Sequence, residues 1–140
     1  MNNFWKRSIT GIVFVGLLIF CAATNKLLLG SLFLFFVIVG TYEYFSIVDS
    51  KKDTSVNKIL GFGLSISTYL LIVSISFFDI SILYLVLLIP ILMTLFVIEL
   101  FRLKENGFSN ILHSLMPTLY VAVPFALFVG SNELIQVEGQ

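Results

Sequence analysis

Five long apolar stretches are the feature that most limits what this chain can fold into. They occupy residues 8–24, 27–48, 59–78, 81–101 and 111–130. Each holds about 17–22 residues, enough for one helical crossing of a hydrocarbon core about 30 Å thick. A soluble domain of 140 residues would not bury five such stretches, because its helices need a polar face toward water. The pattern therefore predicts an all-α fold, a polytopic integral membrane helix bundle with about five transmembrane helices.

The composition fits a membrane protein and argues against other classes. Hydrophobic residues make up 59% of the chain and charged residues only 11%, whereas globular domains typically contain about 25% charged residues. The formal net charge is zero and no basic stripe lies outside the short connections, which argues against nucleic-acid binding. Membrane lipids are the expected partners, and a homodimer is left open. The single cysteine, Cys21, rules out an internal disulfide.

The basic residues indicate which way the bundle crosses the membrane. Seven of the eight Lys and Arg residues lie before the first stretch, between the second and third, or between the fourth and fifth. These seven are Lys6, Arg7, Lys51, Lys52, Lys58, Arg102 and Lys104. Only Lys26 lies on the other set of connections. Because cationic loops resist translocation, we predict a cytoplasmic amino terminus. Five crossings then place the polar tail, residues 131–140, on the opposite side.

Glu43 is the clearest ionisable residue inside an apolar stretch. It lies between Tyr42 and Tyr44, about a turn and a half from the cytoplasmic end of the second stretch. A charge at the middle of the bilayer is unfavourable by about 2.5–3.5 kcal/mol on insertion scales, so such residues are often functional. One interpretation is a carboxylate that faces a polar cavity and binds substrate. The alternative is a Glu near the interface that reaches headgroup water.

Glu99 and Arg102 form a second candidate site. They are three residues apart and share one helix face at the cytoplasmic end of the fourth stretch, so an ion pair is expected. The pair is interpreted either as a structural closure of the helix end or as a substrate contact. His113 lies near the start of the fifth stretch, with no Cys, carboxylate or second His at ligand spacing. No metal site is therefore predicted around it.

Prolines and small residues predict local distortions and close packing. Pro90 lies within the fourth stretch, and Pro117 and Pro124 are seven residues apart in the fifth, which predicts kinks and a shared helix face for the last two. Asp79, in the tight turn before the fourth stretch, is predicted to cap the start of that helix. Small residues four apart favour close helix packing in the third stretch. They are Gly61 with Ser65, and Gly63 with Ser67.

Several catalytic patterns are missing from the sequence. There is no glycine-rich phosphate loop and no closely spaced carboxylate cluster for a divalent metal. Ser/His/Asp chemistry has one histidine to draw on and no local nucleophile signature. From the residues alone we therefore assign no catalytic, cofactor-binding or metal-binding residue, and the substrate-binding candidates are Glu43, Glu99 and Arg102.

Four segments, taken together, carry a family resemblance. Residues 6–13 contain basic residues, a short polar step and a Thr-Gly helix start, and residues 42–45 place a Glu among aromatic residues. Residues 99–102 read Glu-Leu-Phe-Arg, and an Asn-Ile step at 110–111 leads to Tyr-Val-Ala-Val-Pro at 120–124. In order and spacing, over nearly the whole chain, they resemble the bacterial phosphatidate cytidylyltransferases, the CDP-diacylglycerol synthases.

The chain departs from that family at three points. Gly107 stands where the family often has Pro, and Pro117 interrupts a stretch that usually carries Gly. The family's signature, a Ser/Lys/Trp-or-Glu-Gly segment and a later Asp-Arg-x-Asp, has no counterpart in the 140 residues. The resemblance therefore covers the amino-terminal half of the family. Residues 131–140 are expected to lead to a C-terminal catalytic region that this sequence does not contain.

The resemblance implies a reaction, a cofactor and a location. CTP and phosphatidate would give CDP-diacylglycerol and pyrophosphate in phospholipid biosynthesis, through attack of a lipid phosphate oxygen on the α-phosphorus of CTP. Magnesium or a similar divalent metal is implied for the full-length family. The implied location is the bacterial cytoplasmic (inner) membrane. The chain alone is expected not to turn over CTP, and its expected role is to form the membrane cavity and to admit the lipid between helices.

Two other classes remain open. One is a non-enzymatic small polytopic membrane protein, such as a transporter subunit or a scaffold. The other is a fragment of a related CTP-dependent lipid or polyprenol kinase. An Asp-Arg-x-Asp signature encoded beyond residue 140 would favour the cytidylyltransferase over both.

Overall fold

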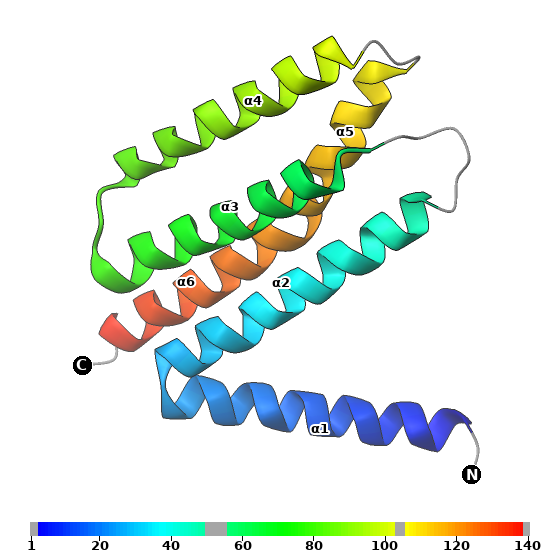
Figure 1. Cartoon of the computed structure of the whole chain (residues 1–140). Coiled ribbons are helices and arrows are strands. Elements are labelled where there is room, and N and C mark those ends of the chain that lie inside the picture. Colours follow the sequence, from blue (N-terminus) through cyan, green and yellow to red (C-terminus); the bar gives the residue numbers. More distant parts are fainter. Residues whose placement is uncertain (1–2, 50–55, 103–105, 139–140) are drawn as a thin grey trace.

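The computed structural model describes residues 3–49, 56–102 and 106–138, and the side chains of 4–49, 56–102 and 106–131. Every regular element in these ranges is helical (Figure 1), which confirms the predicted all-α fold. The elements are α1 (Asn3–Thr24), α2 (Lys26–Asp49), α3 (Lys58–Phe78), η1 (Ile82–Leu87), α4 (Leu88–Phe101), α5 (Gly107–Pro117), η2 (Thr118–Ala122) and α6 (Val123–Glu138). Three of the predicted loop lysines, Lys51, Lys52 and Lys104, lie outside the described residues.

Within the described residues, five helical segments are long and apolar enough to cross a membrane. This agrees with the five predicted spans and makes the protein a multi-pass membrane bundle. The ends of α2 and α3 lie within one residue of the predicted ends. The fifth span differs, because its helix begins at Gly107 and its last part continues to Glu138. Most of the predicted polar tail is therefore helical backbone.

Three spans form the packed core, namely α2, α3 and the span made of α5, η2 and α6. Glycines allow these helices to approach closely. A Cβ on Gly61 would collide with the ring of Phe45 and lie 3.0 Å from the carbonyl oxygen of Ser114. Gly63 has nothing within 4 Å of the same position. Of the two predicted small-residue pairs, the pair of Gly61 with buried Ser65 therefore packs against neighbours, as expected for membrane helices.

The third and fifth spans run side by side in the same direction. Gly61 lies against Ser114, and further along the Ser65 and Thr118 hydroxyl oxygens are 3.0 Å apart. At the other end, a Cβ on Gly130 would meet the Ser76 side chain. The residue numbers at these contacts increase together along both spans, so α3 and α5 begin at the same end of the bundle. That end also carries Lys58 and Arg102, and we call it the basic end.

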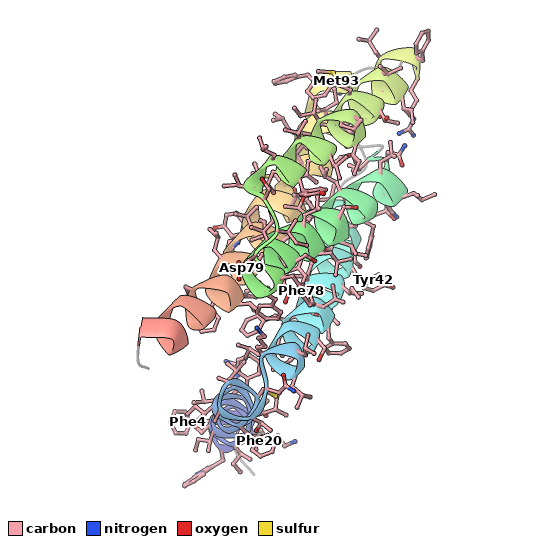
Figure 2. All side chains as sticks on the ribbon, turned by 90° about the vertical axis from the view of Figure 1, so that its left-hand side faces the viewer. Phe4, Phe20, Tyr42, Phe78, Asp79 and Met93 are labelled. Atoms are coloured by element: carbon pink, nitrogen blue, oxygen red, sulfur yellow. The ribbon has the colours of Figure 1, made fainter. Side chains whose placement is uncertain are left out.

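The first and fourth spans lie at the periphery. Helix α1 lies at an angle to α2 and diverges from it toward the amino terminus in Figure 1, and it is seen almost end-on near Phe4 and Phe20 in Figure 2. Cys21 is the one buried side chain among those described on α1. The helix contacts α2 midway along both helices, where the Phe14 and Phe36 ring centroids are 5.2 Å apart. Helix α1 is therefore a poorly buried arm attached to a three-span core.

The prolines change helix type rather than bending a uniform helix. Pro90 falls in the first turn of α4, directly after the 3₁₀ segment η1, where its missing N–H is tolerated more easily. A π-helical segment, η2, lies between Pro117 and Pro124, and the Val123 N–H bonds to the carbonyl of Thr118. The predicted shared face is wrong, because Pro117 is buried while Pro124 is exposed. A π turn inserts an extra residue and rotates everything that follows it.

The predicted cap at Asp79 is also wrong. Asp79 ends α3 with a left-handed backbone (φ 50°) rather than starting the next helix. Ser81 takes that role, since its hydroxyl oxygen accepts a hydrogen bond from the Leu83 N–H at 3.4 Å. Both residue types can cap a helix. The position of the turn decides between them, and the sequence did not indicate it.

Candidate functional site

A buried polar cluster lies at the basic end, where α4 and α5 meet. Glu99 lies in the last turn of α4 with only 5% of its surface exposed. Its Oε2 accepts a hydrogen bond from Arg102 Nη1 at 3.2 Å, so the predicted ion pair is present. Its Oε1 accepts a second one, at 2.8 Å, from Nδ2 of buried Asn110 on α5. The left-handed residue Asn106 (φ 69°) lies at the turn that brings α5 back against α4.

The hydrogen bonds of this cluster are those of a structural contact that holds the end of α4 against α5. Each carboxylate oxygen of Glu99 has a donor within hydrogen-bond distance, and one of the two donors is charged. Charge-assisted hydrogen bonds of this kind are stronger than neutral ones and hold the ends of two helices together. A substrate contact by Glu99 or Arg102 stays a prediction that this geometry does not test.

A second polar contact joins α2 to α5 at the same end. The Tyr44 hydroxyl lies 3.0 Å from Nδ1 of His113, and both side chains are partly buried. His113 is therefore linked to a phenol on a neighbouring helix. The contact places the aromatic flank of Glu43 against the start of the fifth span.

An apolar groove lies between α1, α2 and the fifth span. It has a volume of about 620 Å³, within the range of about 300–1,000 Å³ typical of small-molecule pockets. Five phenylalanines dominate its lining, with Gly40 at the close approach of α2 to Val121. These are Phe14, Phe33, Phe36, Phe125 and Phe128. Because the protein is a membrane bundle, such a surface is surrounded by hydrocarbon and suits an acyl chain better than a nucleotide.

Glu43 is the charged residue of the groove lining, and its side chain is exposed. Within the described residues it makes no hydrogen bond or ion pair, and the structure does not bring it to the Glu99 cluster. The groove beside Glu43 is apolar, and whether this carboxylate binds substrate or reaches headgroup water stays a prediction. Lys6 and Arg7 lie with Thr10 in a recess on α1 that shares Phe14 with the groove.

The described residues do not fit a divalent metal centre. No group of three or more His, Cys, Asp or Glu side chains comes together in the described ranges. Glu99 already holds two nitrogen donors, and Glu43 lies on another helix. Magnesium requires oxygen ligands in near-octahedral geometry. The ligands of a metal implied by the family would therefore have to come from residues outside the described ranges.

Two features of the site escaped the sequence interpretation. The sequence motif at residues 110–111 contains Asn110 but does not predict its contact with Glu99; the signal that could have indicated it is a polar residue at the start of an apolar span. No local sequence pattern predicts the groove, because its phenylalanines lie in three separate spans and come together only when the helices pack.

Comparison with known proteins agrees with the resemblance seen in the motifs. The profile of the cytidylyltransferase family matches residues 5–137, nearly the whole chain. No curated protein and no solved structure matches the sequence. The family match covers all five spans, the Glu99 cluster and the groove. The chain therefore belongs to the cytidylyltransferase family, as one of its multi-pass membrane proteins.

Proposed function

We propose that this protein acts in the conversion of CTP and phosphatidate to CDP-diacylglycerol and pyrophosphate. The observation that carries the proposal is the family match over residues 5–137. The bundle supports it, because phosphatidate is a lipid and the apolar groove faces the hydrocarbon of the bilayer, where the acyl chains of that lipid lie. The part assigned to the described residues is to form the membrane cavity and to admit and orient the lipid.

The reaction is a nucleotidyl transfer. A phosphate oxygen of phosphatidate attacks the α-phosphorus of CTP, and the bond from that phosphorus to the oxygen bridging toward the β-phosphorus breaks. Pyrophosphate leaves with that oxygen, and the lipid becomes CDP-diacylglycerol. Enzymes accelerate phosphoryl chemistry mainly by positioning and by electrostatic stabilisation. The groove would contribute the positioning by restricting where the lipid phosphate lies, and no step is assigned to Glu99, whose oxygens are already engaged.

The proposal includes an orientation. Lys58 and Arg102 lie at the basic end, and Lys6 and Arg7 precede the first span, which puts them on the same side when successive spans alternate in direction; we place this side at the cytoplasmic face of a bacterial inner membrane. CTP is a cytoplasmic nucleotide, so the lipid phosphate has to be presented on this face. Lys26 lies at the connection between α1 and α2, on the other face.

Two radioactive forms of CTP test the proposal and separate it from its alternatives. Membranes containing the complete gene product are incubated with phosphatidate, diacylglycerol or polyprenol, and with CTP labelled at the α- or the γ-phosphorus. We expect the α-label to enter the lipid with phosphatidate, because the cytidylyl group is transferred. Entry of the γ-label with diacylglycerol or polyprenol would instead identify a kinase. Incorporation of neither label would favour a non-enzymatic scaffold.

A parallel sample contains residues 1–140 alone. We expect it to incorporate neither label, since the described carboxylates form no metal centre. Incorporation of the α-label by this sample would show that residues outside the described ranges complete the active site within the 140-residue chain.

A further inference from the structure

The groove beside α1 differs from a site for another helix. Transmembrane helices associate through small residues that let their backbones approach. The groove is lined by five phenylalanines and has a single glycine, Gly40, whose position is already occupied by Val121. The five rings contact one another, with ring centroids 5.2–6.1 Å apart, and together form an apolar surface against which flexible methylene chains can pack. The lining therefore favours a lipid chain over a protein helix.

The polarity along the groove matches that of a phospholipid. Its floor is apolar, and its lining extends on α2 to Glu43, near the basic end. On the opposite wall, α1 continues past Phe14 to Thr10, Arg7 and Lys6, which line the adjoining recess. An anionic headgroup would be drawn to the cations on α1 and repelled by Glu43 on α2. The two walls thus direct a phosphate to one side of the opening.

We propose that the groove binds one anionic phospholipid, with an acyl chain among the phenylalanines and the phosphate against Lys6 and Arg7. Helix α1 diverges from α2 toward its amino terminus (Figure 1), and the groove through which such a lipid would enter from the bilayer is lined by residues of both helices. The choice of phosphatidate as the probe rests on the proposed function. The binding itself requires only a diacyl lipid with a negative phosphate, which a structural lipid such as phosphatidylglycerol also provides.

Photocrosslinking tests where the acyl chain lies. The complete protein is reconstituted in phosphatidylcholine vesicles with phosphatidate that carries a diazirine on one acyl chain, and adducts are mapped by mass spectrometry. We expect adducts on groove residues of α2 and α6. Val39→Trp, which fills the groove from an exposed lining position, should abolish these adducts. Ile38→Trp is the matched control, because Ile38 is equally exposed but outside the lining, and its adducts should stay at the wild-type level.

Headgroup selectivity tests the position of the phosphate. The ratio of phosphatidate to phosphatidylcholine adducts should fall about fivefold for each cation removed in Lys6→Gln and Arg7→Gln. Lys58→Gln, at the same end but paired with Asp49, should leave the ratio unchanged. A phosphatidylglycerol probe separates the sources: equal labelling indicates a general anionic-lipid site, and stronger phosphatidate labelling indicates the substrate.

Three outcomes would overturn the inference. These are equal labelling by phosphatidate and phosphatidylcholine, adducts confined to surfaces outside the groove, and loss of adducts in Ile38→Trp as well as in Val39→Trp. Each variant is first checked for folding by size-exclusion chromatography in detergent. If groove labelling fails while the α-label of CTP still enters phosphatidate, this inference is wrong and the proposed function stands.

Discussion

Replacement of Glu99 by alanine removes the acceptor that joins α4 to α5. The hydrogen bond from Asn110 Nδ2 is buried and has a charged acceptor, a type that stabilises by about 1.5–3 kcal/mol. The Arg102 side chain is 29% exposed, so its ion pair adds at most about 1 kcal/mol. Arg102 and Asn110 each keep a further interaction, which limits the loss. We therefore expect the free energy of unfolding of Glu99→Ala to fall by about 2 kcal/mol.

A double-mutant cycle measures this contribution. Unfolding of wild type, Glu99→Ala, Asn110→Ala and the double variant is followed in mixed micelles by circular dichroism. The coupling free energy should be about 1.5 kcal/mol, because residues in direct contact are not additive. Glu99→Gln keeps an amide oxygen for Asn110 and should lose less stability than Glu99→Ala. A coupling below about 0.5 kcal/mol, the usual range for independent sites, would refute the reasoning.

Three further predictions concern packing, hydrogen bonds and orientation. Gly61→Ala should lower the free energy of unfolding by about 1–3 kcal/mol, because the added methyl group collides with Phe45. Gly63→Ala is the control, since its added methyl group lies in open space and should leave stability unchanged or raise it by up to about 1 kcal/mol. Equal melting temperatures of the two variants would contradict this. Tyr69→Phe removes a buried 2.7 Å hydrogen bond to the Gly30 carbonyl and should lose about 1 kcal/mol of stability, while Tyr84→Phe, at an exposed position, should lose none. In a Cys21→Ser background, a membrane-impermeant maleimide applied outside intact cells should label Asn25→Cys but not Asn57→Cys; the reverse pattern would invert the proposed orientation.

The spans were predictable because their cause is local. A run of about 20 apolar residues has to become a helix in lipid, where each backbone N–H and C=O needs an internal partner. The pair of Glu99 and Arg102 was predictable for the same reason, since residues three apart on a helix are neighbours. Its third member, Asn110, lies on another helix. The sequence could not indicate that contact, because it depends on how the turn at Asn106 directs α5.

The failed predictions share a different cause. Asp79 and Ser81 are both good caps, and their roles depend on where α3 stops. The spacing of Pro117 and Pro124 would place them on one face of a regular helix, but the π turn between them separates the faces. The first case depends on where a helix ends and the second on an inserted residue within a helix, and apolar composition fixes neither. Such differences change which residue caps a helix or which face a side chain occupies without removing the helix.

The groove follows from the same packing rule that builds the core. Where glycines lie at the contacts, as at Gly30, Gly61 and Gly130, neighbouring side chains come into direct contact with the helix backbone. Gly11 and Gly16 of α1 have nothing within 4 Å, and α1 packs through Phe14, which contacts Phe36, and through Leu18, Cys21 and Ala22 instead. The two helices diverge toward the basic end (Figure 1). The distribution of small residues therefore produces both a close-packed three-span core and an open aromatic groove that faces the lipid.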